Sequence, residues 1–429
     1  MSLGYKNLKL TSLNKFYQKI RKSNDYSKIL ENFISLSLIR VADFILPLIA
    51  LPYIISVIGV DKFGLIAFVT SVVTYFLNIT QYGFSLSAVR DLSINQNNPK
   101  KTEDIFNSVF TTKLYLFIFS FIIIILLIFS IPSFYENQLL YFIATGLILG
   151  DVLFPKWFFQ GIEQMRYITI INTLVKLVYV FLIFVFVKEK SDYILVLFFQ
   201  SITAVIAGFY SLYIVFYKHK IKIRIASFIN VKQQLNYSFS SCVTLITPTL
   251  YSNTSIFLLG IFTNTTVVGY FSGAIRITNA FSSLNTILTR TFYPFVNKTK
   301  NSIKKINMLI LIFGLFTTIF MFVSASFTVE NILGNNMINS IPLVLILSLS
   351  PLLLSIRTVY GINYLLANKM DNLYMKIALF SSIFGLIIGL ILIPMFGATA
   401  AALVIITSQL LYASLSYIFH MKKKRLYGI

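Results

Sequence analysis

The sequence lacks most of what a soluble enzyme needs. Its 429 residues include one cysteine and two histidines, so a disulfide framework is excluded and a Cys/His metal centre or haem is not expected. Only 12% of the residues are charged, whereas 57% are hydrophobic, and the mean hydropathy is +0.81. This is too little polar material to cover a water-exposed surface. There is also no Walker phosphate loop, so the chain does not encode ATP hydrolysis.

Long apolar runs, such as residues 117–130, take the place of polar surface. A helix needs about 20 apolar residues to cross the ~30 Å hydrocarbon layer. The sequence therefore predicts an all-α polytopic membrane protein with twelve transmembrane helices and no cofactor. The predicted spans are 31–58, 63–90, 105–131, 139–155, 168–187, 193–217, 235–262, 267–296, 306–330, 341–366, 373–393 and 398–420. Trp157 lies at the end of the fourth span, where an interfacial anchor is expected.

The 36 lysines and arginines are distributed very unevenly between the predicted connections. If the N-terminus is cytoplasmic, 27 of them lie on the cytoplasmic side, three on the opposite side and six within spans. By the positive-inside rule this bias predicts that both termini are cytoplasmic. Topology and attraction to anionic lipid thus account for most of the net charge of +22, and nucleic acid is not an expected partner.

The two halves of the chain form an internal repeat. A shift of 205 residues places Phe63-Gly64-Leu65 on Val268-Gly269-Tyr270 and Met165 on Met370, at matching positions relative to the spans. Two six-helix lobes in parallel order predict a pseudo-two-fold axis along the membrane normal with a central cavity between them. The expected parts are a basic arm (1–30), an N-lobe (31–225), a C-lobe (226–421) and a basic tail (422–429). This is the architecture of an alternating-access transporter.

Ionisable residues inside the spans are the candidate site. Six cations face only two acids there, a balance that pairing cannot neutralise, so we expect a water-filled cationic cavity that receives an anion. Asp43 lies three residues after Arg40, which leaves open an ion pair or a role in ion coupling, and Asp151 is the second coupling candidate. The candidate anion-binding residues are Arg40, Lys113, Lys176, Arg276, Arg290 and Arg357, of which Arg290 and Arg357 are close enough to the cytoplasmic side to snorkel.

Neutral polar side chains also occur within the spans. They could hydrogen-bond sugar hydroxyls or hold helices together, and the second role is expected for most of them. These residues are Asn78, Gln81, Asn172, Gln200, Asn253, Asn279, Asn285 and Gln409.

Several short segments resemble a known family. The first hairpin, with Ile45-Leu46-Pro47-Leu48, Leu51-Pro52-Tyr53-Ile54 and Phe63-Gly64, resembles that of O-antigen repeat-unit flippases. These Wzx-type transporters belong to the multidrug/oligosaccharidyl-lipid/polysaccharide exporter superfamily. The similarity runs in order from about residue 30 to the end of the chain. Its other segments are Gln81-Tyr82-Gly83-Phe84, the connection from Trp157 to Met165, Val268-Gly269-Tyr270-Phe271, Tyr293-Pro294 and Ser350-Pro351.

The resemblance implies a transporter rather than an enzyme. Its substrate would be an undecaprenyl-diphosphate-linked oligosaccharide, moved from the cytoplasmic to the periplasmic leaflet of the inner membrane. Membrane lipids, a polysaccharide polymerase and a chain-length regulator would be its partners. The alternatives are a lipid-linked peptidoglycan precursor flippase, a multidrug exporter of the same superfamily and, less favoured, a membrane glycosyltransferase or polymerase. A cationic cavity agrees with a diphosphate and disfavours an exporter of cationic drugs.

Overall fold

The computed structural model describes residues 24–247, 249–296, 300–366, 368 and 370–427. Within these ranges, the side chains of 24–48, 244, 287, 290–296, 300–303 and 423–427 lie outside the description. Every regular element in the described residues is a helix. Most of the predicted basic arm 1–30 lies outside these residues.

The first half of the chain folds into helices that match predicted spans one to six. Helices α2 (Asn24–Gln81) and α3 (Phe84–Ile94) hold spans one and two. Spans three to six are α4 (Pro99–Ser130), α6 (Gln138–Leu153), α8 (Met165–Phe186) and α9 (Tyr193–Lys218). Short elements join them, namely α5 (Pro132–Glu136), α7 (Lys156–Gly161) and the 3-10 turn η1 (Lys190–Asp192).

The second half follows the same order with more interruptions. Span seven is divided into α10 (Phe228–Ile246) and α11 (Thr249–Phe262), and α12 (Thr265–Val296) is span eight. Span nine is α13 (Lys300–Val323), followed by α14 (Ala325–Thr328), η2 (Val329–Leu333) and η3 (Asn335–Ser340). Span ten comprises α15 (Ile341–Leu347), α16 (Ser350–Arg357) and η4 (Thr358–Leu366), and α17 (Asp371–Tyr427) holds the last two spans.

Two long helices each contain a sharp turn at a glycine. Gly59 in α2 has φ 79° and ψ 164°, and Gly397 in α17 has φ 59° and ψ −134°. Glycine adopts such dihedrals without the Cβ clash that other residues suffer. Eight helical stretches of the described residues are long and apolar enough to cross a membrane. Two of them contain these turns, and the helices to which they belong, α2 with 58 residues and α17 with 57, are long enough for two spans each. With α10–α11 and α12, they account for the predicted twelve.

The repeat appears directly in the contact between the halves. A Cβ at Gly64 would clash with the carbonyl oxygen of Thr265 and lie 2.7 Å from the amide nitrogen of Gly269. A Cβ at Gly269 would in turn clash with the carbonyl oxygen of Val60. Since Val60 and Gly64 are the counterparts of Thr265 and Gly269 at the 205-residue offset, this contact is reciprocal, as expected at a two-fold axis. The predicted pseudo-symmetry is therefore confirmed.

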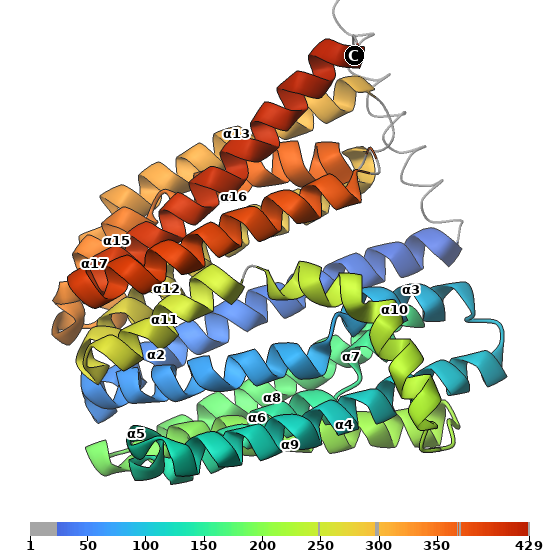
Figure 1. The fold of residues 1–429 in the computed structure, drawn as a ribbon, viewed down its shortest axis with the longest axis horizontal. Helices are drawn as coiled ribbons and strands as arrows, with labels where there is room; N and C mark the ends of the chain where they lie inside the picture. Colours follow the sequence, from blue (N-terminus) through green and yellow to red (C-terminus); the bar gives the residue numbers. More distant parts are fainter. Residues whose placement is uncertain (1–23, 248, 297–299, 367, 369, 428–429) are drawn as a thin grey trace, which may run out of the picture.

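The two halves lie side by side, joined along α2 and α12 (Figure 1). At one end of the bundle, which we call the Gly59 end, Gly59 lies near Lys190 of η1 and Gly397 lies near Thr263. The other, which we call the basic end, carries α3, which contains Arg90, and the C-terminal end of α9 at Lys218. The largest group of buried apolar residues contains Ile58 of the first half and Phe271 of the second, so both halves share it. A smaller core, which contains Phe84, Phe106, Trp157 and Phe158, lies in the first half.

That smaller core corrects the expectation for Trp157. Its side chain is only 3% exposed, and its ring centroid lies 5.6 Å from that of Phe106. The residue is an interior packing element of the first half, since an indole surrounded by Phe side chains does not reach the membrane interface.

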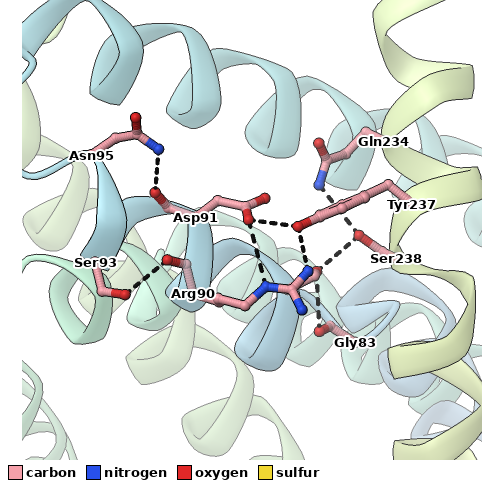
Figure 2. A network of polar contacts seen from close by, with 9 residues as sticks. Gly83, Arg90, Asp91, Ser93, Asn95, Gln234, Tyr237 and Ser238 are labelled. Atoms are coloured by element: carbon pink, nitrogen blue, oxygen red, sulfur yellow. Dashed lines mark hydrogen bonds and ion pairs between the residues drawn. The ribbon is translucent and has the colours of Figure 1, made fainter.

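Span seven is shared between the two halves. Helix α10 packs against α3 and α4 of the first half, whereas α11 packs mainly against α17 of the second. At the basic end, Tyr237 of α10 donates a hydrogen bond of 2.6 Å to Asp91 of α3 and accepts one from Arg90 (Figure 2). The hydroxyls of Ser87 and Ser238 are 2.8 Å apart beside them. The helix of span seven is interrupted between Ile246 and Thr249.

Candidate functional site

Arg276 lies where the two halves meet. It is in the middle of α12, and its side chain is exposed although Ala274 and Ile277 beside it are buried. Its guanidinium carbon lies 5.3 Å from the ring centroid of Phe63 on α2. It is also close enough to Tyr179 on α8 for an electrostatic interaction. A cation of the second half therefore faces two aromatic side chains of the first.

Among the described residues, no ion pair includes Arg276. Ionisable side chains within membrane spans usually face the protein interior or a water-filled cavity and mark substrate or ion pathways. A side chain that is accessible, charged and without a carboxylate is thus suited to receive an anion.

Lys176 lies on the same side of this region. It is three residues before Tyr179 on α8, a spacing that places both on one face of the helix. Helix α8 packs against α2, which carries Phe63. Lys176 therefore shares a helix face with Tyr179, the residue of α8 that lies close to Arg276.

Arg357 occupies a different environment at the end of α16. Its guanidinium carbon lies 5.2 Å from the ring centroid of Tyr412, and Tyr251 is close enough for an electrostatic interaction. Tyr374 is close enough for an electrostatic interaction, and the buried Nε atom has no hydrogen-bond partner. Tyrosines rather than carboxylates surround this cation, so its charge is also not compensated by an ion pair of the described residues. Cation–π contacts offset only part of the desolvation cost.

Lys113 is separate from this group. Its side chain is buried, and its Nζ atom lies 3.2 Å from Asp151 Oδ2 and donates to the Asp151 carbonyl oxygen at 3.0 Å. Lys156 and Gln81 contact the other carboxylate oxygen of Asp151 at 3.8 and 3.3 Å. The charge of Lys113 is therefore compensated within the first half, which removes it from the cations available to an anionic ligand.

We expect single substitutions of this pair to destabilise the protein more than the double substitution does. Lys113→Met leaves a buried carboxylate and Asp151→Asn leaves a buried ammonium, each at a cost of about 3–5 kcal/mol. The double variant removes both charges and should recover most of the loss. The coupling is measured by heating the detergent-purified variants and determining, at each temperature, the fraction of protein that remains monomeric.

Lys156→Met is the matched control, because Lys156 is more exposed and 3.8 Å from the carboxylate. It should change the unfolding temperature little. Additive effects of Lys113→Met and Asp151→Asn would contradict a direct interaction between the two groups.

The side chains of three predicted site residues lie outside the description. Arg40 and Asp43 lie on α2 and Arg290 lies on α12, but their side chains are outside the described residues. Their roles remain predictions.

A second feature of the interior is an uncharged polar cavity. Its volume is about 290 Å³, and it lies between α11, α12, α15, α16 and α17, with Thr74 of α2 closing one side. Three of the neutral polar residues singled out in the sequence, Asn253, Asn279 and Gln409, line it. Others of that set connect helices, since Asn78 bonds to Thr249 at 3.2 Å and Asn285 to Thr317 at 3.0 Å.

Sequence patterns did not indicate the aromatic partners of the arginines. Phe63 is 213 positions from Arg276, and no helical spacing connects them. Tyr179 alone carries a signal, because it shares a helix face with Lys176. The serines and threonines of α12 were a further signal, because a membrane helix rich in hydroxyls faces protein or a cavity rather than lipid.

The fold and the matches to known proteins agree. Residues 29–300 match the family model described as polysaccharide biosynthesis protein. The chain belongs to this family. It is 28% identical over 404 residues to a "Putative O-antigen transporter" of Escherichia coli (strain K12), which covers 92% of this chain and 97% of that protein. A protein of the same description from Shigella dysenteriae is 27% identical over 272 residues, 62% of this chain and 67% of its own length. These matches confirm the resemblance to Wzx-type transporters.

Two solved transporter structures superpose on most of this chain. The lipid II flippase MurJ in an inward closed conformation superposes with a TM-score of 0.68 at 15% identity, covering 92% of this chain and 87% of MurJ. An inward-facing multidrug resistance transporter of the MATE family superposes with a TM-score of 0.65 at 14% identity, covering 90% of this chain and 98% of the transporter. At such low identity these likenesses establish the fold only, which is the predicted one of two six-helix lobes.

Proposed function

We propose that this protein is a flippase that moves undecaprenyl-diphosphate-linked oligosaccharide repeat units across the membrane by alternating access, for O-antigen or a related surface polysaccharide. The observation that carries this is Arg276, an accessible cation between the two halves that no described carboxylate neutralises. A diphosphate supplies the missing negative charge and accepts the bidentate hydrogen bonds that a guanidinium donates. Lys176 is the proposed second contact, from the other half.

The proposed orientation places the basic end in the cytoplasm. The end of α9 at Lys218 and the C-terminal end of α17 lie there. The turns at Gly59, near Lys190 of η1, and at Gly397, near Thr263, lie at the opposite end. With an inner-membrane location, the substrate would enter from the basic end and leave at the Gly59 end. Close contact of Gly64 with Thr265 would then close the periplasmic side.

Two alternatives within the superfamily differ in their substrate charge. An exporter of cationic drugs would face repulsion from Arg276 and Arg357, so their lack of carboxylate partners disfavours it. A lipid II flippase shares the diphosphate and cannot be separated by charge. The names of the two relatives favour an O-antigen repeat unit. Asp151 and Asp43 are the candidates for ion coupling, although Asp151 already has Lys113 as a partner.

The membrane potential should accelerate transport toward the Gly59 end. An anion leaving an electrically negative cytoplasm moves down the potential, and about two charges gain ~4–5 kcal/mol per 100 mV. We expect faster flipping of the lipid-linked oligosaccharide in proteoliposomes with an inside-negative valinomycin potential and no pH or sodium gradient.

The matched control is the same preparation without valinomycin. Rates that do not respond to the size or sign of the potential would contradict the electrogenic mechanism. A strict need for a proton or sodium gradient would instead favour antiport, which Asp151→Asn should then abolish at every pH.

A further inference from the structure

The uncharged polar cavity beside Arg276 is built from groups that match sugar hydroxyls. Nine of its fourteen lining residues are Ser, Thr, Asn or Gln, and the rest are Ile or Leu. None is charged. Side chains of the first kind donate and accept hydrogen bonds, as sugar hydroxyls do, whereas aliphatic side chains pack on the C–H faces of a ring. A bare diphosphate would find no cation in the lining, and a metal ion would find no carboxylate.

Three polar atoms of the lining residues are buried without a hydrogen-bond partner. They are Ser282 Oγ, Ser350 Oγ and Gln409 Oε1, from α12, α16 and α17. Ser350 is 1% exposed and Ser282 8%. Buried polar groups are usually paired, and an unpaired one reduces stability. The residues that carry these atoms line one cavity from three helices, so a hydroxylated ligand there would pair with them once their side chains turn toward it.

The cavity lies next to the proposed diphosphate contact. Its lining residue Ile275 directly precedes Arg276 on α12, and Asn279 follows one turn later. From Arg276 to Ser282 the helix rises about 9 Å. On α16 the lining residue Leu354 lies three positions before Arg357, on the same helix face. The cavity is therefore flanked by two arginines that no described carboxylate compensates.

From these observations we infer that this cavity is the glycan subsite of the transporter. It binds the uncharged sugar nearest to the diphosphate through Ser282, Ser350 and Gln409 while Arg276 holds the phosphate. This inference rests on the proposed function and deepens it, since it assigns the recognition of the sugar to the C-lobe. Thr74 places one wall of the subsite on the first half, so movement of the halves would open it.

The first test compares stability with transport, because removing a ligand-binding hydroxyl should leave the unfolding temperature unchanged or higher but should lower the transport rate. Ser282→Ala and Ser350→Ala remove unpaired atoms, so the substrate-free protein should unfold at the same or a higher temperature. Flipping of the lipid-linked oligosaccharide should nevertheless fall by about three- to tenfold for each lost hydrogen bond.

Ser381→Ala and Ser382→Ala are the matched controls. Both hydroxyls are fully buried and unpaired, but neither residue lines the cavity. They should have the same effect on unfolding and none on transport. Equal transport by all four variants and the unsubstituted protein would overturn the inference.

The second test separates the sugar from the diphosphate. In a Cys242→Ser background, Asn279→Cys places a single thiol in the lining for labelling with a polar maleimide. The probes are lipid-linked repeat units extracted from the native membranes and sugar-free undecaprenyl diphosphate. Protection by the first alone supports the glycan subsite. Equal protection by both, or by neither, contradicts it.

The same preparation keeps the two proposals distinguishable. If the unsubstituted protein does not flip the extracted lipid, the proposed function fails, whatever the labelling shows. If it flips the lipid while labelling at position 279 is unchanged, only the glycan subsite fails.

Discussion

Arg276→Ala should reduce surface polysaccharide at least tenfold while the protein remains folded and present at normal levels. The substitution removes charge-assisted hydrogen bonds to the diphosphate, each worth about 1.5–3 kcal/mol. It should not destabilise the protein, because Arg276 is exposed and makes no ion pair with a described residue. Immunoblots of the surface polysaccharide, normalised to the level of the protein in the membrane, measure the effect. Size-exclusion profiles of the purified variant show whether it remains folded.

Arg276→Lys keeps the charge but not the planar pair of donors, so it should retain partial activity. Arg166→Ala is the control, since Arg166 is an exposed arginine at the basic end, close to Tyr167. Full polysaccharide with Arg276→Ala would remove this residue from the site. We expect Arg40→Ala to have a similar effect if its side chain faces the same cavity, as its place in span one predicts.

Gly64→Val should lower transport by tenfold or more through an effect on conformation. A side chain here would overlap the Thr265 carbonyl oxygen and separate α2 from α12. Forcing extra methyl groups into a packed contact costs about 1–3 kcal/mol. Because the state closed at the Gly59 end depends on this contact, the substitution should depopulate that state. Val268 is fully buried beside the contact. The substitution Val268→Cys in a Cys242→Ser background therefore provides a cysteine whose reactivity reports whether the contact is open.

Gly389→Ala is the control for this experiment. A Cβ at Gly389 would meet its nearest neighbour at 3.5 Å, an ordinary contact. The reporter cysteine should react faster with an impermeant maleimide when Gly64 is substituted and at an unchanged rate when Gly389 is. An unchanged labelling rate with Gly64→Val would show that the halves do not close through this contact.

The Lys113–Asp151 pair illustrates a limit of sequence reasoning. Both residues were recognised as ionisable groups inside spans, one as an anion contact and one as a coupling site. The two residues are 38 positions apart, and their pairing joins α4 to α6. No periodicity predicts which faces of two helices meet. Only the packing of the helices shows that one charge compensates the other.

The amino-acid sequence by itself determined the membrane class, the number of spans and the duplication of the chain. These depend on local composition, since a run of about 20 apolar residues must form a helix in lipid whatever lies around it. The offset of 205 residues even identified Gly64 and Gly269 as equivalent before their contact was known.

The tertiary structure separated the cations whose side chains it describes into different environments. Arg276 is accessible and lies beside Phe63 and Tyr179 of the other half, whereas Lys113 is paired with Asp151 inside its own half. It also gathered Ser282, Ser350 and Gln409 from three helices around one cavity. The physical reason is that the free energy of a buried charge or hydroxyl depends on neighbours brought close by folding, and these lie far away in the sequence.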